Sequence, residues 1–148
     1  MCSCCFIGHR DCPNELYQEL LESTRMLIMN KDVRVFYVGT EGKFDKFAYR
    51  VLKELEKEYC IETFVVLAYL RKDMDLDKYD LGKTIFPDVL DNTPLRLAIR
   101  KRNSYMIDNA EYVITYLDSP GTNTVKMVRE ALKKRKQVIN LGRYNPTI

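Results

Sequence analysis

Residues 33–42 read VRVFYVGTEG, an apolar run that stops abruptly at a turn containing two glycines. Because β-branched and aromatic residues favour extended structure, residues 33–38 predict a buried strand. Apolar residues then recur at helical spacing over 44–55, which predicts a helix directly after the turn. The stretch therefore has the order strand, glycine turn, helix, which is the repeating unit of an α/β protein with a parallel sheet.

The same unit recurs along the whole chain. Apolar runs predict five strands, at residues 4–7, 33–38, 62–69, 112–117 and 138–141. Four helical segments are predicted to begin near Pro13, near Phe44, at Thr93-Pro94 (as cap and first-turn proline) and after Thr122. This alternation predicts an α/β fold with a doubly wound, mostly parallel five-stranded sheet and helices on both faces.

Length and composition agree with one globular domain over residues 1–148. The chain is 46% hydrophobic and 30% charged, and its net charge of +3 is too small to indicate nucleic acid by itself. It contains no run of about 20 apolar residues and no basic-then-apolar signal segment. We therefore expect a soluble, cytoplasmic protein without a membrane partner.

The cysteines predict packing rather than chemistry. Their number is odd and no secretion signal accompanies them, which argues against a disulfide framework. The C-x-C-C spacing at residues 2–5 lacks the gap that lets two thiolates bind one zinc ion. We expect reduced, structural cysteines, no metal and no cofactor.

Three glycine-containing turns fall where a parallel sheet binds its ligands. Such sheets bind outside the carboxyl ends of their strands, and residues 8–10, 39–42 and 119–122 follow the first, second and fourth predicted strands. Glycines allow close backbone approach, and Arg10 adds a planar fork that suits a phosphate or carboxylate. The three turns together favour a phosphate-bearing ligand over ordinary turn chemistry.

Two further features leave alternatives open. Arg102 interrupts the apolar stripe of the third predicted helix, so it either forms a buried ion pair, extends to solvent, or reaches the ligand crevice together with Asn103. Tyr69 either stacks on a base at the crevice or packs in the core. Residues 70–92 lack periodicity, and so long a loop is expected to be functional or partly folded.

Several motifs occur together in an order that identifies a known group. They are CFIGHR at residues 5–10, FYVGTEG-x-FD at 36–45 and AI-x-KRN-x-x-M at 98–106, with residues 80–87 and 112–116. The set resembles the small YpsA-like proteins of the SLOG superfamily and covers nearly the whole chain. The resemblance implies a Rossmann-like fold that binds nucleotides or nucleotide-derived small molecules, and homo-dimers or higher homo-oligomers.

The resemblance makes a binding protein the first hypothesis. It would capture a nucleotide or nucleotide-derived signal as a sensor or sequestering sponge, for example in phage–host defence signalling. Glycines and Thr122 would permit backbone approach, arginines would hold anionic groups, and carboxylates would accept ribose hydroxyls. The expected ligand-binding residues are Gly8, His9, Arg10, Gly39, Thr40, Glu41, Gly42, Asp45, Tyr69, Arg102, Asn103, Ser119, Gly121 and Thr122.

Two alternative functions remain. The first is an N-glycosidic or phosphoribosyl hydrolase with Glu41 and Asp45 as catalytic carboxylates. Against it, Asp45 has an adequate structural role at a helix start, and residues 120–126 lack the glutamate of the family's phosphoribohydrolase loop. The second and weaker alternative is a module that binds single-stranded nucleic acid, which we expect to be an unlikely partner.

Overall fold

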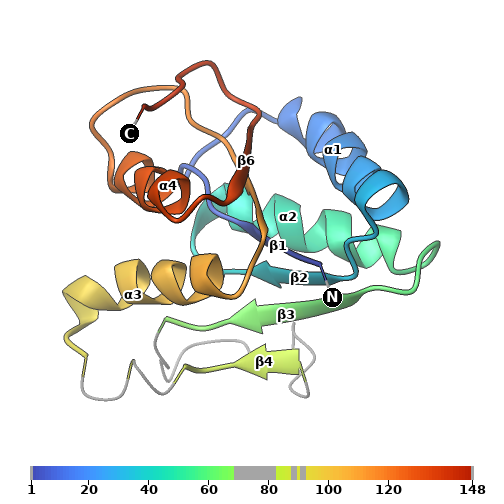
Figure 1. Cartoon of the computed structure of the whole chain (residues 1–148), viewed down its shortest axis with the longest axis horizontal. Helices are drawn as coiled ribbons and strands as arrows, with labels where there is room; N and C mark the ends of the chain where they lie inside the picture. Colours follow the sequence, from blue (N-terminus) through green and yellow to red (C-terminus); the bar gives the residue numbers. More distant parts are fainter. Residues whose placement is uncertain (1, 69–82, 88–89, 91–92, 148) are drawn as a thin grey trace.

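The computed structural model describes residues 2–68, 83–87, 90 and 93–147, and within them the chain forms a six-stranded sheet and four helices (Figure 1). The elements are β1 Ser3–Phe6, α1 Leu16–Lys31, β2 Val35–Val38, α2 Gly42–Leu55, β3 Glu62–Val66, β4 Thr84–Ile85, α3 Leu95–Asp108, β5 Tyr112–Thr115, α4 Asn123–Lys133 and β6 Gln137–Asn140.

The sheet has the strand order β4-β3-β2-β1-β5-β6, and every neighbouring pair is parallel. All strands therefore end at one edge, which we call the carboxyl edge and which lies on the left in Figure 1. Chain order runs outward in both directions from β1, so the order reverses between β1 and β5. This reversal is the switch point at which open α/β sheets bind ligands. The predicted doubly wound, Rossmann-like sheet is confirmed.

Alternating side chains of β1 separate two buried layers. Cys4 and Phe6 face a core formed with α1 and α2, whereas Cys5 and Ile7 face a core formed with α3 and α4. All four side chains are at most 3% exposed. Because parallel strands are covered by helices on both faces, an uninterrupted apolar run is the pattern that such a strand requires.

The prediction of five strands is wrong by one. β4 lies within residues 70–92 and pairs with the end of β3 through Val65 opposite Thr84. A strand of two residues is too short to produce any alternation, so the sequence pattern could not reveal it. Tyr69 and residues 70–82 of the predicted loop lie outside the described residues.

The start of α3 also differs from the prediction. Pro94 is the N-cap residue with an extended ψ of 141°, and no side chain accepts a capping hydrogen bond there. Thr93 therefore is not the cap, and the proline precedes the first helical turn instead of occupying it. A proline fits this place because its missing N–H has no helical partner in any case.

The five cysteines carry free thiols, and burial raises the pKa of Cys4 and Cys5 well above the ordinary value. Among the described residues, no three metal-ligating side chains form a cluster.

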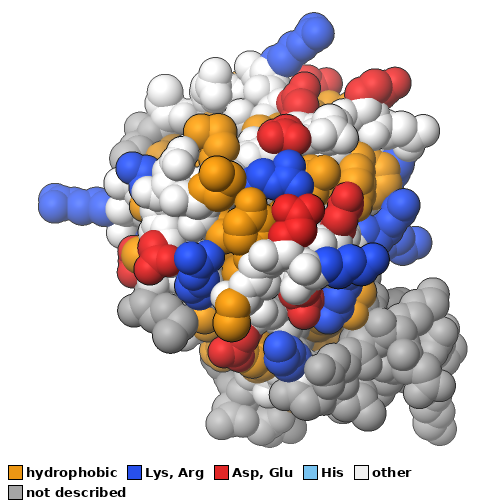
Figure 2. Space-filling model, turned by 90° about the vertical axis from the view of Figure 1, so that its right-hand side faces the viewer, with side chains coloured by type: hydrophobic (Ala, Val, Ile, Leu, Met, Phe, Trp, Pro, Cys, Tyr) orange, Lys and Arg blue, Asp and Glu red, His pale blue; other side chains and the backbone are white. Residues whose placement is uncertain are grey.

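No helix in the described part of the chain is long and apolar enough to span a bilayer. Figure 2 shows the side of the molecule where the strands begin, and there basic and acidic side chains are intermixed.

Candidate functional site

The loops that follow β1 and β5 are tied together at the switch point. The His9 backbone N–H donates to the Tyr116 carbonyl oxygen at 3.1 Å, and the two rings meet edge to face with centroids 6.0 Å apart. Burial lowers the pKa of His9, and the nearby Asp118 carboxylate opposes this shift. The imidazole is therefore predominantly neutral at neutral pH and presents an aromatic surface at the carboxyl edge.

The loop after β1 also fixes the start of α2. The Lys43 N–H donates to the Arg10 carbonyl oxygen at 2.7 Å, and Asp45 Oδ2 accepts the Glu41 N–H at 2.8 Å. Gly42 has a φ of +88°, and a Cβ there would lie 2.7 Å from the Arg10 carbonyl oxygen. Only glycine satisfies both the left-handed backbone and this close approach.

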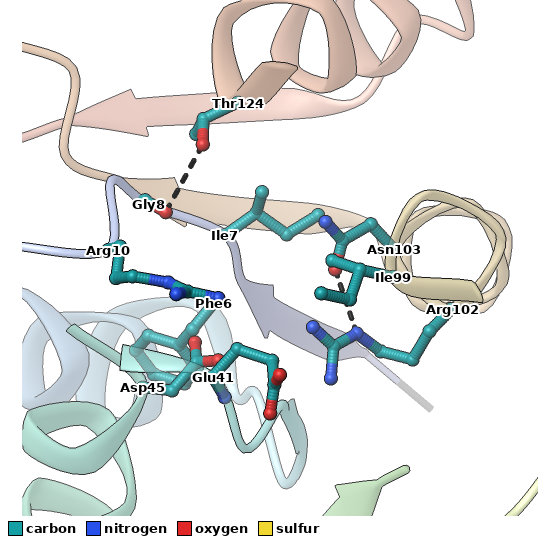
Figure 3. A pocket seen from close by; sticks show the side chains of 10 residues that line it. All are labelled: Phe6, Ile7, Gly8, Arg10, Glu41, Asp45, Ile99, Arg102, Asn103 and Thr124. Atoms are coloured by element: carbon teal, nitrogen blue, oxygen red, sulfur yellow. Dashed lines mark hydrogen bonds between the residues drawn. The ribbon is translucent and has the colours of Figure 1, made fainter. Parts of the chain in front are cut away.

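A cavity of about 110 Å³ opens between this loop, α2 and α3 (Figure 3). Arg10 and Arg102 point toward each other from opposite sides of it. Arg102 is only 2% exposed; its Nη1 donates to the Val66 carbonyl oxygen at 3.1 Å and its Nε to Asn103 Oδ1 at 2.9 Å. The lining residues are Phe6, Ile7, Gly8, Arg10, Glu41, Asp45, Ile99, Arg102, Asn103 and Thr124.

Asp45 is the buried carboxyl group of this cavity. Burial raises its pKa to about 6, although the Arg102 guanidinium, the Glu41 N–H and Arg10 each favour the ionised form. Its location agrees with the structural alternative, because it accepts a backbone N–H at the start of α2. The Glu41 carboxylate accepts the Thr40 hydroxyl at 3.2 Å, so a neighbouring side chain orients it.

We expect the raised pKa of Asp45 to lower the unfolding free energy as the pH rises from about 4 to about 6. Between its unfolded value of 3.8 and its folded value of about 6, the folded state binds more protons than the unfolded state. The full loss is about 3 kcal/mol, at about 1.4 kcal/mol per pH unit. Urea unfolding of wild type and Asp45→Asn at about pH 4 and about pH 7 measures it. Equal pH dependence of the two proteins would contradict the assignment.

Packing within the protein explains why two of the predicted site positions are glycine. A Cβ at Gly8 would lie 2.6 Å from the Phe44 ring, and one at Gly39 would lie 2.5 Å from Arg102 Nη1 and 2.8 Å from Asp45 Oδ2. A side chain at Gly39 would therefore displace the protein's own charged groups. Gly121, by contrast, has a φ of +80° and open space around it.

The predicted site residues divide among separate places. Gly8, Arg10, Glu41, Asp45, Arg102 and Asn103 line the cavity, whereas His9, Ser119 and Thr122 line an open hollow of about 700 Å³ on the other side of the β1 loop. Thr122 also caps α4, because its Oγ1 accepts the Val125 N–H at 3.2 Å. Gly39 and Thr40 line a third hollow, along α2. Tyr69 lies outside the described residues.

The third hollow contains residues that the sequence did not mark as functional. Lys43, Lys46, Phe47, Tyr49 and Arg50 line it, and it measures about 290 Å³. The basic positions 43, 46 and 50 repeat at helical spacing, a pattern that also describes the solvated face of any amphipathic helix. Spacing alone therefore could not distinguish a binding groove from an ordinary polar surface.

Comparison with known proteins adds a fold relationship. No family model matches the sequence, and no curated protein matches it. The structure is similar to DNA processing protein A (DprA) from Streptococcus pneumoniae, with a TM-score of 0.71 and 13% identity over 94% of this chain and 50% of that chain. It is also similar to DprA from Helicobacter pylori, with a TM-score of 0.66 and 16% identity over 97% of this chain and 66% of that one. The chain thus spans half to two thirds of these neighbours.

The likeness confirms the Rossmann-like fold that the SLOG resemblance implies, and it corrects the expected function. The H. pylori protein is described with a single-stranded DNA binding mode. This finding contradicts the main interpretation, a binder of nucleotide-derived small molecules, and the expectation that nucleic acid is an unlikely partner. The cavity of about 110 Å³ is smaller than the roughly 300–1,000 Å³ typical of small-molecule pockets, whereas the open hollow lined by His9, Ser119 and Thr122 lies within that range at about 700 Å³.

Proposed function

We propose that this domain binds single-stranded nucleic acid along the carboxyl edge of its sheet. The observation that carries the proposal is the convergence of Arg10 and Arg102 on a cavity that suits one phosphate group better than a whole nucleotide. The fold likeness to a protein with a described single-stranded DNA binding mode supports the same class of partner.

The two arginines have different roles in this proposal. Arg102 is fixed by its hydrogen bonds to Val66 and Asn103, so it supplies a fixed positive charge at the back of the cavity. Arg10 is exposed at the mouth, where its planar guanidinium can donate two parallel hydrogen bonds to a phosphate. A phosphate at this position would contact Arg10 directly and be attracted by Arg102 from behind.

The open hollow on the other side of the β1 loop gives an unstacked base a place beside that phosphate. Its lining includes the rings of His9 and Tyr116, and aromatic rings stack on bases of any sequence. Asp11 and Asp118 also line this hollow and would repel phosphates from it. Glu41 and Asp45 line the cavity as well, so the two places differ in their arginines and their aromatic rings. The arginines favour a phosphate at the cavity and the rings favour a base in the hollow, an arrangement that a duplex with its stacked bases does not offer.

Three probes of matched sequence test the proposal by fluorescence anisotropy. We expect a labelled oligothymidine to bind more tightly than a duplex of equal length, and unlabelled thymidine monophosphate to displace it only at far higher concentration. The logarithm of affinity should fall with the logarithm of salt concentration at about −0.7 per phosphate contacted. Lack of oligothymidine binding, or displacement by the monophosphate at a similar concentration, would overturn the proposal.

We further infer that the chain belongs with the small YpsA-like proteins of the SLOG superfamily. The fold likeness to DprA supports a Rossmann-like fold of that kind, and the motifs at residues 5–10, 36–45 and 98–106 support the finer placement. Arg10 and Arg102, the two residues on which the proposed function depends, lie within the first and last of these motifs.

A further inference from the structure

One side of α2 carries three basic residues in a row. Lys43, Lys46 and Arg50 are separated by three and four positions, which places them on the same side of the helix. They line the groove of about 290 Å³ described above, whose remaining lining is Gly39, Thr40, Asp45, Phe47 and Tyr49. Lys46 and Arg50 are exposed, and Lys43 is half-buried.

The charge of this groove is uncompensated within the described part of the chain. No described carboxylate lies within 4.0 Å of the side-chain nitrogens of Lys43, Lys46 or Arg50. Lys53, one turn further along the same helix, does form an ion pair, with Glu56 at 3.1 Å. The groove's own acid, Asp45, is buried and accepts the Glu41 N–H. The groove is thus positive, unlike an ordinary helix surface on which opposite charges pair.

Aromatic rings hold two of these cations in place. The Lys43 Nζ lies 5.5 Å from the Phe47 ring centroid, and the Arg50 guanidinium lies 5.9 Å from the same centroid and 5.3 Å from that of Tyr17. Cation–π attraction restricts these long side chains before any partner arrives. A partner of opposite charge then loses less affinity to side-chain ordering than it would on freely rotating lysines.

The groove is continuous with the carboxyl-edge site. Asp45 lines both the groove and the cavity of Arg10, and Lys43 lines both the groove and the open hollow of His9. A chain that leaves Arg10 in the direction of α2 therefore meets Lys43 first, and then Lys46 and Arg50. Proteins that bind single-stranded nucleic acid use such a row of cations along a groove to contact successive phosphates of its backbone.

We propose that the α2 groove is a second segment of the single-strand path, in which Lys43, Lys46 and Arg50 bind the phosphates that flank the one held at Arg10. This inference rests on the proposed function and extends it by stating the direction in which the bound nucleic acid crosses the protein surface. Its contacts would go to phosphates alone, so it would add affinity without sequence preference. An acidic protein segment is the competing occupant, and the test below distinguishes it.

The test compares two double variants that each remove two exposed positive charges. Lys46→Ala with Arg50→Ala changes the groove, whereas Lys31→Ala with Lys133→Ala changes the C-terminal ends of α1 and α4. Helices run back against their strands, so these ends lie at the edge opposite the site. Each protein is titrated with oligothymidines of about 4 and about 16 nucleotides, the span of known single-strand site sizes. Circular dichroism verifies that both variants fold.

We expect the groove variant to weaken binding of the longer oligonucleotide by roughly threefold to thirtyfold and the shorter by less than twofold. Its salt slope with the longer one should decrease in magnitude by about 1.4, for two lost phosphate contacts. The control variant should lose less than half as much affinity. Equal losses in the two variants, or none in the groove variant while wild type still binds, would overturn the groove and leave the proposed function standing.

Two other outcomes separate the remaining possibilities. Failure of wild type to bind either oligonucleotide would overturn the proposed function itself, and the groove's role with it. Polyglutamate that binds wild type as tightly as the longer oligonucleotide, and loses its affinity in the groove variant, would assign the groove to an acidic protein partner and overturn the nucleic-acid path.

Discussion

Replacing Arg10 by alanine is expected to weaken binding of single-stranded DNA by roughly tenfold to a hundredfold, which corresponds to about 1.5–3 kcal/mol for hydrogen bonds to a charged group. The guanidinium is exposed at the mouth of the cavity and has little packing to lose. The unfolding free energy should therefore change by less than about 0.5 kcal/mol. Fluorescence anisotropy and urea unfolding measure the two quantities separately.

Arg135→Ala is the matched control for Arg10→Ala. Arg135 is also exposed, but it follows α4 at the edge where the strands begin. Its loss should weaken binding by no more than about twofold, the general effect of one distant surface charge. Arg10→Lys should lie between alanine and wild type, because lysine retains the charge but lacks the planar fork. Arg10→Ala with an affinity within twofold of wild type would show that the phosphate lies elsewhere.

The largest expected effect on stability comes from Gly39→Val, which should cost about 3–5 kcal/mol of unfolding free energy. A Cβ at this position would lie 2.5 Å from Arg102 Nη1 and 2.8 Å from Asp45 Oδ2. The displaced guanidinium would leave the Val66 carbonyl without its 3.1 Å hydrogen bond and would move away from a buried carboxylate. Urea unfolding measures this loss.

Gly121→Ala provides the comparison for Gly39→Val. Gly121 also has an unusual backbone, with a φ of +80°, but nothing lies within 4 Å of a Cβ built there. Only the left-handed backbone opposes the substitution, at a cost of about 1–2 kcal/mol. Equal stabilities of the two variants would show that Arg102 and Asp45 move aside without loss, and that the packing assigned to Gly39 is wrong.

The sheet could be predicted from sequence because β1 is buried along its whole length, and β2, β3 and β5 each bury at least half of their residues. Such strands appear as continuous apolar runs ended by glycine turns, as at residues 33–42. β4 could not be predicted because a strand of two residues at the sheet edge shows no alternation of apolar and polar residues. The predicted start of α3 was wrong by one residue, because a proline fits both the N-cap and the first helical position.

The site could be predicted only in part, for a different reason. A charge within an apolar stripe identified Arg102, yet spacing could not tell whether it met the core, the solvent or the cavity that it lines. The expectation of a small-molecule ligand is contradicted by the likeness to DprA, which depends on the arrangement of the whole fold and which no local sequence pattern records. The sequence did not indicate the α2 groove, because a sequence pattern cannot show whether a carboxylate pairs with Lys46 or Arg50 in the fold. No described carboxylate does so.

Photo-crosslinking with mass spectrometry tests the central claim most directly, because it locates the strand on the unmodified protein. Oligothymidine carrying photoreactive bases is irradiated with the protein, and the crosslinked residues are identified after digestion. We predict crosslinks at the switch-point loops, around His9 and Tyr116, and along α2 near Lys43 to Arg50. Crosslinks confined to the hollow between α1 and β6, which Met26 and Ile139 line and which shares no lining residue with the proposed path, would contradict the account.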